Sequence, residues 1–549
     1  MADDRNSHYG QTHGVDRRDF LGLATLGTAL ALVRPFGDAA MAQETPVRPF
    51  ELEEITVAEL QEGMHSGRFT AKSLTEAYLG RIDAIDKRGP AINAMIEINP
   101  DAGGIAEALD RERKEKGPRG PLHGIPVLIK DNIDTADRMH TTAGSLALSE
   151  NVAARDAFVA QRLREAGAVI LGKTNLSEWA NFRSTHSTSG WSGRGGQTRN
   201  PYVLDRNPCG SSSGTGAGIA ANLAALGVGT ETDGSVVCPS SASALVGIKP
   251  TLGLVSRAGI IPIAHSQDTA GSMARTVTDA AILLGVLAGI DSRDEITSRS
   301  RGKAEADYTK FLDANGLKGM RIGVARKFFG FNDHVDRLMK ASIDVIKSLG
   351  ATIVDPADMA STGKYDDSEL DVLLCEFKAD LNKYLGGLSP AVKSRSLADL
   401  IKFNEENRDK EMPFFGQEPF ERAQKKGPLT SAAYKKALAK NHRLSRAEGI
   451  DAVLSKHKLD AVIAPTGGPV WPTDLANGDH FTGGYSTASA VAGYPHITVP
   501  AGLAFGLPVG LSFFAGPWSE PALIKFAYAY EQATKARQKP QFLAKAPIM

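Results

Sequence analysis

The sequence predicts an α/β protein with a large central sheet that helices cover on both faces. Short runs of consecutive apolar residues alternate with longer amphipathic stretches, which is typical of buried strands connected by helices. The chain has 549 residues and is 42% hydrophobic, enough for a large core. The predicted strands are residues 124–129, 168–172, 225–230, 320–325, 460–465, 496–500 and 507–514.

The first 42 residues have the features of an export signal. Paired Arg17 and Arg18 precede Asp-Phe-Leu, an apolar run follows over 20–33, and Ala40-Met-Ala42 supplies a cleavage site. The paired arginines favour the twin-arginine export route, which carries folded proteins. We therefore predict a twin-arginine signal peptide over 1–42 and a periplasmic or secreted protein. No later apolar run reaches the length of a membrane helix, so we expect no integral membrane association after cleavage.

Helix signals mark the beginning of the mature chain. Thr56 and Glu59 form a capping box that opens a helix, and a second helix is predicted over 70–85, where apolar residues fall on one face. Further helices are expected at 157–166 and 217–225.

The stretch from about 290 to 440 differs from the rest of the chain. It is richer in charge and poorer in strand patterns, and 291–307 has the composition of a solvated loop. We interpret this stretch as a helix-rich insertion on the same core.

The composition excludes several classes of function. The chain has 63 Lys and Arg residues and 63 Asp and Glu residues, so its net charge creates no strong positive potential that would attract nucleic acid. We therefore expect no nucleic-acid partner. The three cysteines, Cys209, Cys238 and Cys375, are too few for a disulfide framework. For Cys209 and Cys238 the sequence favours two packed thiols over one bridge. Neither a metal nor a cofactor is expected, because no His/Cys/Asp cluster has metal-ligand spacing.

Candidate chemistry concentrates in residues 205–251, where two Gly/Ser loops flank an apolar run and a short strand. Glycines let backbone N–H groups approach a ligand, so Ser235 within GTETDGSVVCPSS (229–241) is a candidate nucleophile. The run 210–214 matches the G-x-S-x-G nucleophile elbow, but no buried strand precedes it. The glycines of 214–218 lack the lysine of a phosphate-binding loop.

A cysteine nucleophile needs a positioned histidine, and nothing in the sequence singles one out. We interpret four histidines as hydrogen-bonded structural residues and not as catalytic partners: His123, His186, His265 and His496.

A lysine is the alternative base for Ser235. Lowering a lysine pKa from about 10.4 to about 7 requires burial that costs roughly 4 to 5 kcal/mol. Lys130, Lys173 and Lys249 each follow an apolar strand and are all candidates. The residues favour Lys130 only narrowly, because its apolar run is the longest and Asp131-Asn132 follows it to orient the amine.

The 205–251 segment, together with GIPVLIKDNI at 124–133, resembles the amidase signature family. The resemblance runs from about residue 50 to about 540 and implies a large mixed central sheet within one amidase signature domain over 43–549. It also implies a Ser–cis-Ser–Lys triad that forms an acyl-enzyme. Position by position, the lysine falls on Lys130, the cis serine on Ser211 and the nucleophile on Ser235. The implied oxyanion hole consists of the backbone N–H groups of Thr232, Asp233, Gly234 and Ser235.

Within the family the likeness is strongest to bacterial peptide amidases, which release ammonia from C-terminally amidated peptides. The supporting stretches are 173–183, 190–202, 209–216, 229–239 and 253–271. Many family members have Gly-Gly-Ser-Ile-Arg at the nucleophile, whereas this chain has Asp233-Gly-Ser-Val-Val237. That departure argues against substrates inferred from the members that carry the arginine.

The resemblance leaves the substrate open. The expected partner is a small-molecule or short-peptide amide. The alternative is an aryl-acylamidase, or a broad-specificity amidase or esterase, acting on anilides or other xenobiotic amides. A glutamine-hydrolysing tRNA amidotransferase subunit conflicts with the export signal, and a binding protein on an inactive scaffold conflicts with the filled triad.

The substrate-binding residues expected are Thr142, Gly144, Ser145 and Trp191, with further walls near Trp471 and Tyr485. The sequence does not specify an oligomeric state.

Overall fold

The computed structural model describes residues 49–547. The predicted signal peptide, residues 1–42, lies outside the described residues. Within 49–547, none of the helices combines the length and the apolar character needed to cross a membrane.

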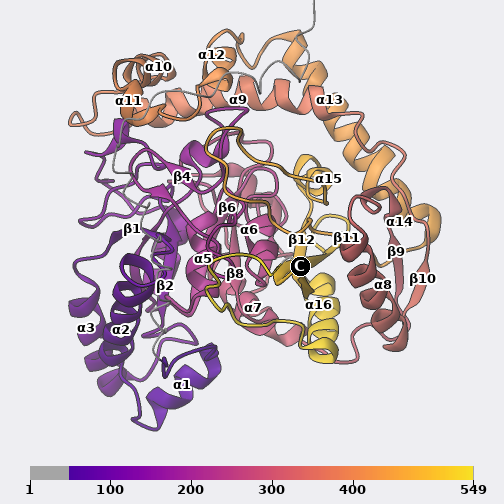
Figure 1. The fold of residues 1–549 in the computed structure, drawn as a ribbon, viewed down its shortest axis with the longest axis horizontal. Helices are drawn as coiled ribbons and strands as arrows, with labels where there is room; N and C mark the ends of the chain where they lie inside the picture. The colour runs from indigo at the N-terminus through magenta and orange to yellow at the C-terminus, as the bar shows by residue number, and fades with distance from the viewer. Residues whose placement is uncertain (1–48, 548–549) are drawn as a thin grey trace, which may run out of the picture. The chain divides into compact units, whose positions relative to one another are not determined.

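A mixed sheet forms the centre of the structure and confirms the predicted fold class (Figure 1). In residues 49–547 it has eleven strands, in the order β1-β3-β2-β6-β8-β7-β12-β13-β11-β9-β10. The strands are β1 (Met95–Ile98), β2 (Pro126–Lys130), β3 (Val169–Thr174), β6 (Leu226–Glu231), β7 (Val246–Lys249), β8 (Thr269–Ala274), β9 (Arg321–Val324), β10 (Thr352–Val354), β11 (Ala461–Pro465), β12 (His496–Ala504) and β13 (Leu507–Phe514). A separate two-stranded hairpin joins β4 (Trp191–Ser192) to β5 (Gly196–Gln197).

The strand directions bring the candidate residues to one edge of the sheet. β2 pairs in parallel with both β3 and β6, whereas β6, β8, β7, β12 and β13 pair antiparallel in turn. Because parallel strands end at the same edge, Lys130 at the end of β2 lies beside the end of β6 at Glu231.

Helices pack on both faces of the sheet and along its ends (Figure 1). α5 contacts β2, β3 and β6 and packs against α6, whereas α7 contacts β6, β7 and β8 and packs against α16. The helices of the first half are α1 (Val57–His65), α2 (Ala71–Arg81), α3 (Ala102–Lys116), α4 (Phe158–Glu165), α5 (Ser213–Ala220), α6 (Val237–Ala242) and α7 (Val277–Leu287). Those of the second half are α8 (Asp333–Ser348), α9 (Asp366–Gly386), α10 (Leu397–Glu406), α11 (Arg408–Glu411), α12 (Glu418–Gln424), α13 (Ala432–Ser445), α14 (Asp451–His457), α15 (Thr487–Ala492) and α16 (Glu520–Thr534).

The sequence predicted most of these elements. All seven predicted strands are present, and the capping box of Thr56 and Glu59 opens α1 as expected. The predicted helix at 217–225 is wrong in its bounds, since α5 begins at Ser213 and ends at Ala220. The Gly and Ser residues at 213–216 indicated a loop, but every residue of α5 is buried and tertiary packing outweighs their poor helix propensity.

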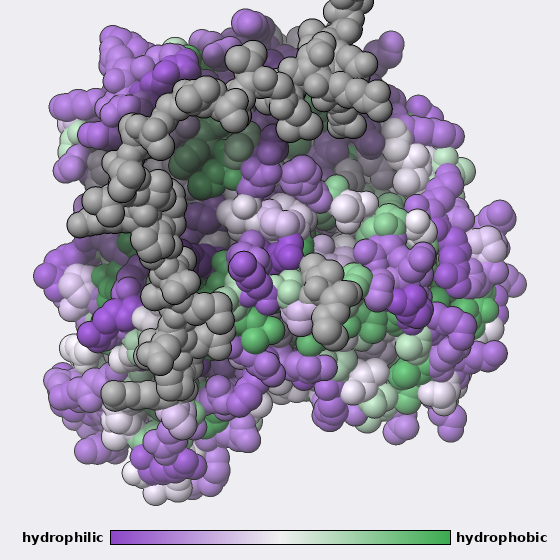
Figure 2. Space-filling view, viewed as in Figure 1, coloured by the Kyte–Doolittle hydropathy of each residue, from purple (hydrophilic) through white to green (hydrophobic). Residues whose placement is uncertain are grey.

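The stretch 290–440 contains both strands and helices. Its first part adds β9 and β10 to the end of the sheet, and its second part forms α9 to α12 and the beginning of α13. These later helices lie together along one side of the sheet, in orange in Figure 1. The face drawn in Figure 2 is mostly polar, with apolar residues gathered in a hollow beside these helices.

Candidate active site

Lys130 is the central side chain of the site. It is the last residue of β2 and is fully buried. Its Nζ donates to Ser211 Oγ at 2.7 Å, to Thr230 Oγ1 at 2.9 Å and to the Thr230 carbonyl at 3.3 Å. Burial lowers the pKa of Lys130 to about 7, although the carboxylates of Glu231 and Asp268 act to raise it. A substantial fraction of this amine is therefore neutral near pH 7 and able to accept a proton.

The other two candidate lysines have different partners. The Nζ of Lys173 donates to the Ile133 carbonyl and to Thr141 Oγ1, and the Nζ of Lys249 donates to the Pro250 carbonyl. Both are fully buried, yet within residues 49–547 neither donates to a serine. The structure thus separates three lysines that the sequence left as alternatives.

Ser211 lies between Lys130 and the loop after β3. The Gly210–Ser211 peptide bond is cis, as the resemblance implied. The Ser211 carbonyl accepts from the backbone N–H of Ser177 at 3.1 Å, and its hydroxyl is buried against Lys130. A Cβ at Gly210 would clash with Ser177 Oγ, so a larger residue cannot replace this glycine without displacing Ser177.

Ser235 lies in the turn that connects β6 to α6. Gly234 has φ +77°, a conformation that favours glycine, and Ser235 follows it directly. The carbonyl of Ser235 accepts from the backbone N–H of Ser212 at 3.2 Å, so the two serine-bearing segments lie side by side. Lys130 and Ser211 are fully buried, whereas Ser235 is 8% exposed. Of the three residues, Ser235 is the one that retains some solvent exposure.

The turn presents a row of backbone donors. Within residues 49–547, the N–H groups of Thr232, Asp233, Gly234 and Ser235 donate to no protein acceptor. The next two, of Val236 and Val237, donate to Glu231 Oε2 at 2.8 and 3.1 Å. Glu231 therefore closes the turn around four consecutive unpaired donors, which can stabilise an oxyanion.

Acidic side chains hold this turn from its other side. Thr232 Oγ1 donates to Asp268 Oδ1 at 2.6 Å, and Asp268 Oδ2 accepts from the backbone N–H groups of Ile263 and Ala264. Burial raises the pKa of Asp268 to about 6 and also raises that of Glu231. These carboxylates both fix the turn and oppose the lowering of the Lys130 pKa.

A cavity of about 310 Å³ adjoins the site. Its walls include Thr230 and Thr232, the apolar run 260–263, and Tyr384 of α9. Gln267 connects the same helix to the turn, since its Nε2 donates to Glu369 Oε1 at 2.9 Å and to the Thr232 carbonyl at 3.2 Å. Helix α9 therefore forms part of the wall beside the candidate oxyanion donors.

The residues predicted to bind substrate lie in a neighbouring network in which their polar groups contact protein. Thr142 Oγ1 and the Gly144 N–H both donate to Asp131 Oδ2, and Ser145 Oγ donates to Glu411 Oε1. Trp191 packs edge-on against Phe414 and Phe415. None of the four lines the 310 Å³ cavity, and their contact with substrate stays a prediction.

The further predicted walls also use their polar atoms within the protein. Tyr485 stacks on Phe514 and its hydroxyl pairs with Ser489 Oγ at 2.7 Å, while Trp471 Nε1 donates to Asp479 Oδ1 at 3.0 Å. A Cβ at Gly234 would contact Ser486 Oγ at 3.2 Å, which places the segment after Tyr485 beside the turn.

The histidines have other hydrogen-bond partners. Nε2 of His123 pairs with the Leu109 carbonyl, and Nε2 of His496 with Ser512 Oγ. His186 pairs with the Thr185 hydroxyl. His265 Nδ1 pairs with Asp380 at 2.7 Å, while Glu376 and Asp380 place carboxylate oxygens close to the same ring.

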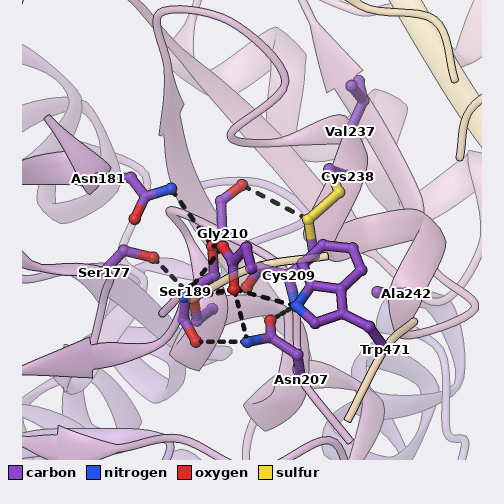
Figure 3. Close-up of a disulfide and its surroundings, with 12 residues drawn as sticks. Ser177, Asn181, Ser189, Asn207, Cys209, Gly210, Val237, Cys238, Ala242 and Trp471 are labelled. Carbon is purple, nitrogen blue, oxygen red and sulfur yellow. Dashed lines mark hydrogen bonds between the residues drawn. A yellow bond between two sulfur atoms is a disulfide. The ribbon is translucent and has the colours of Figure 1, made fainter. Parts of the chain in front are cut away.

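The prediction of two separate thiols is wrong. Cys209 and Cys238 form a disulfide, with Cα atoms 6.0 Å apart (Figure 3). The spacing of 29 residues along the chain does not reveal this proximity, which arises because α5, the helix after the cis-serine loop, packs against α6.

Comparison with known proteins identifies the family. Residues 73–524 match the family model described as Amidase. The chain belongs to the amidase family. It is a hydrolase of C–N bonds in amides, and the expected resemblance to the amidase signature family is confirmed.

Three similar proteins span nearly all of this amidase. A probable amidase of Arabidopsis thaliana is 44% identical over 522 residues, which cover 94% of this chain and 96% of the relative. The solved structure of the peptide amidase PAM with the competitive inhibitor chymostatin is 50% identical, with a TM-score of 0.87, over 90% of this chain and 100% of that chain. A glutamyl-tRNA(Gln) amidotransferase subunit of Alkalilimnicola ehrlichii is 35% identical, over 89% of this chain and 99% of the relative.

Sequence reasoning missed several residues that shape the site. Thr230 receives hydrogen bonds from Lys130 and from Asn132 Nδ2, so Asn132 acts on the lysine through that hydroxyl. Asp131 orients the 142–144 loop, whereas it was expected to orient Lys130. Thr230 and Glu231 lie within the segment that drew attention to Ser235, but no pattern distinguishes their roles before the strand and turn are seen.

Proposed function

We propose that this amidase cleaves carboxamide bonds through Ser235, Ser211 and Lys130, and that its substrates are peptide C-terminal amides, from which it releases ammonia. The observation that carries the triad is the 2.7 Å contact between Lys130 Nζ and Ser211 Oγ at a buried lysine whose pKa lies at about 7. The peptide-amide substrate is supported by the 50% identity to the peptide amidase PAM.

The hydrogen bond between Lys130 and Ser211 supports the first part of the proposed proton path. Neutral Lys130 accepts a proton from Ser211 Oγ, and Ser211 takes the proton of Ser235 as that oxygen attacks the carbonyl carbon of the substrate. The four unpaired N–H groups of residues 232–235 stabilise the oxyanion that forms. In comparable sites one such donor contributes about 3 to 4 kcal/mol.

Two steps complete the turnover. Ser211 and Lys130 return the proton to the leaving nitrogen, which departs as ammonia and leaves an acyl ester on Ser235. Water then attacks the ester, losing its proton to the same relay, and Ser235 is restored as the product acid leaves.

We also propose that the protein is exported by the twin-arginine route to the periplasm or the exterior. Arg17, Arg18 and the apolar run after them motivate this proposal. The Cys209–Cys238 disulfide supports it, because disulfides persist in oxidising compartments and are rare in the cytosol. Replacing both arginines by lysine should retain the protein in the cytoplasm, as measured by fractionation. Unchanged export of that variant would contradict the proposal.

The substrate test compares three amides with the purified chain from residue 43. The expected result is ammonia release from an N-blocked dipeptide amide at a rate well above hydrolysis of the matching p-nitroanilide and of free glutamine. Ser235→Ala and Lys130→Ala should abolish release, while Ser348→Ala on the exposed side of α8 serves as the matched control. Activity on the anilide alone would show that the substrate is an aryl amide and not a peptide amide. Activity in Ser235→Ala would contradict the proposed triad.

A further inference from the structure

The disulfide connects the two segments that carry the proposed serine pair. Cys209 precedes Ser211 by two residues, and Cys238 follows Ser235 by three. Figure 3 shows the bond between the loop at Gly210 and the first turn of α6. A covalent link thus lies very close in the chain to both hydroxyls that must exchange a proton.

Each cysteine is hydrogen-bonded within the segment that carries its serine. The Cys238 N–H donates to the Gly234 carbonyl at 2.8 Å, so the turn that bears Ser235 continues into α6. The Cys209 N–H donates to Asn207 Oδ1 at 2.8 Å, and Ser213 Oγ donates to the Cys209 carbonyl at 2.6 Å. These bonds enclose Ser211 between residues 209 and 213 and Ser235 between residues 234 and 238.

Few polar contacts otherwise bridge the two segments directly. Ser212 donates from its N–H to the Ser235 carbonyl, and its hydroxyl bonds the Thr230 carbonyl at 3.1 Å. On the far side of the loop, Asn207 Nδ2 donates to the Ser189 carbonyl and to Asp479 Oδ1, each at 3.1 Å (Figure 3). That network fixes the loop to residues outside the turn. Lys130 Nζ bonds both Ser211 Oγ and Thr230, and Asn200 Nδ2 bonds the carbonyls of Asn207 and Ala242. The disulfide is the covalent link among the contacts that align the loop with Ser235.

The two halves of the disulfide differ in exposure. Cys209 is nearly buried, whereas Cys238 is partly exposed. A thiolate can attack Sγ of Cys238, which releases the Cys209 thiolate, and the second thiol of a dithiol then closes to a cyclic disulfide. The cysteines end as two thiols and the dithiol is oxidised, so electrons and protons balance.

We propose that the Cys209–Cys238 disulfide positions Ser211 against Ser235, so that its reduction lowers turnover while the fold persists. The inference rests on the proposed function, since it assumes that these two serines exchange a proton. The cysteines are positioning residues that act through the serines. A misplacement of about 1 Å can cost about 100-fold in rate, so we expect kcat to fall roughly 10- to 100-fold on reduction and KM to change less than about twofold.

The experiment measures the folded enzyme in three forms: oxidised, reduced with a dithiol, and with Cys209→Ser and Cys238→Ser combined. Near-UV circular dichroism reports the fold, and the rate of Ser235 phosphonylation by a fluorophosphonate reports the reactivity of the nucleophile. The Cys375→Ser variant is the matched control, because Cys375 is the one remaining cysteine in the sequence and is free. Its sensitivity to the dithiol should equal that of the parent.

The expected result is a lower kcat and slower phosphonylation in the reduced and double-serine forms, with native dichroism. Reoxidation should restore kcat and the phosphonylation rate of the reduced parent, and should leave both quantities unchanged in the double-serine variant. An unchanged kcat with only a lower thermal midpoint would overturn the proposal, as would loss of native dichroism on reduction, since the bond would then serve folding alone. Failure of the oxidised enzyme to hydrolyse any amide would count against the proposed function, while the phosphonylation rates would still test the alignment.

Discussion

Two neighbouring strands end in buried lysines with contrasting surroundings. β2 and β3 pair in parallel, and Lys130 of β2 and Lys173 of β3 are both fully buried with pKa values lowered by burial. Hydroxyl and carbonyl oxygens surround the Lys130 amine. The charge of Lys173 is instead offset by nearby carboxylates, chiefly those of Asp131 and Asp134.

The difference shows that burial alone does not produce a base. Around Lys173 the carboxylates favour the charged amine, and the amine in turn offsets the burial that raises the pKa of Asp131. Around Lys130 the hydrogen-bond partners are neutral oxygens, and the carboxylates of Glu231 and Asp268 only partly oppose the lowering of its pKa by burial. One lysine therefore serves as a counter-ion in the structure, and the other is available for proton transfer.

The largest effect should come from removing the proposed base. Lys130→Ala should lower kcat by about 10³-fold or more, since it removes the acceptor of the proton relay. Steady-state kinetics on a peptide amide, with circular dichroism to confirm the fold, measures the change. Near-normal turnover in this variant would assign the base elsewhere.

Replacing the other lysine should affect stability more than catalysis. Lys173→Met removes a buried cation that acts on the Asp131 carboxylate, which keeps Arg194 at 3.7 Å, and this should lower the free energy of unfolding by about 1 to 3 kcal/mol. Urea denaturation measures the loss, and kcat per folded molecule should remain close to that of the parent. Equal losses of kcat in the two lysine variants would remove the contrast between the strands.

The pH profile tests the protonation state of Lys130. Its neutral form is the active one and its pKa is about 7, so kcat/KM should fall as pH decreases through 7. The rate at pH 6 should be about tenfold below that at pH 8. If kcat/KM instead fell only as the pH decreased through about 4, the base would be a carboxylate.

The same shift predicts a stability effect. The folded state binds fewer protons at Lys130 than the unfolded chain between pH 7 and 10.5, so its contribution to the free energy of unfolding rises with pH in that window. Comparing the parent with Lys130→Met by denaturation at several pH values isolates this contribution. An identical pH dependence in both proteins would argue against the lowered pKa.

The smallest effect concerns the carboxylate next to the turn. Glu231→Gln removes a charge that raises the pKa of Lys130, while its amide oxygen can still accept from the N–H groups of Val236 and Val237. The acidic limb of kcat/KM should therefore move to lower pH. A limb that moves upward, or does not move, would show that Glu231 does not influence the base.

The fold was more predictable than its edges. The apolar runs of β2, β3, β11 and β13 marked central strands, because strands buried on both faces need continuous hydrophobic sequence. β8, with the sequence Thr-Ala-Gly-Ser-Met-Ala, was missed because small residues carry little hydrophobic signal. β1 and β10, at the two ends of the sheet, were missed because strands of four and three residues are too short to show a hydrophobic pattern.

The site was predictable in its chemistry and less so in its geometry. Residue types alone left three lysines open, and the family resemblance selected Lys130, which the structure brings to Ser211. The disulfide was not predictable, because the spacing of Cys209 and Cys238 says nothing about how their loops pack. Thr230 escaped notice since a threonine at the end of a strand has no distinguishing pattern.

The alternation of side chains at the end of β6 limits the genetic changes that the site tolerates. Thr230 receives the Lys130 amine, whereas the next residue, Glu231, accepts from the first turn of α6. Because successive strand residues point in opposite directions, an in-frame deletion of one codon within β6 would exchange these roles. The carboxylate would then meet the amine and keep it protonated. Among spontaneous variants, single-codon deletions in this strand should therefore be recovered as inactive proteins.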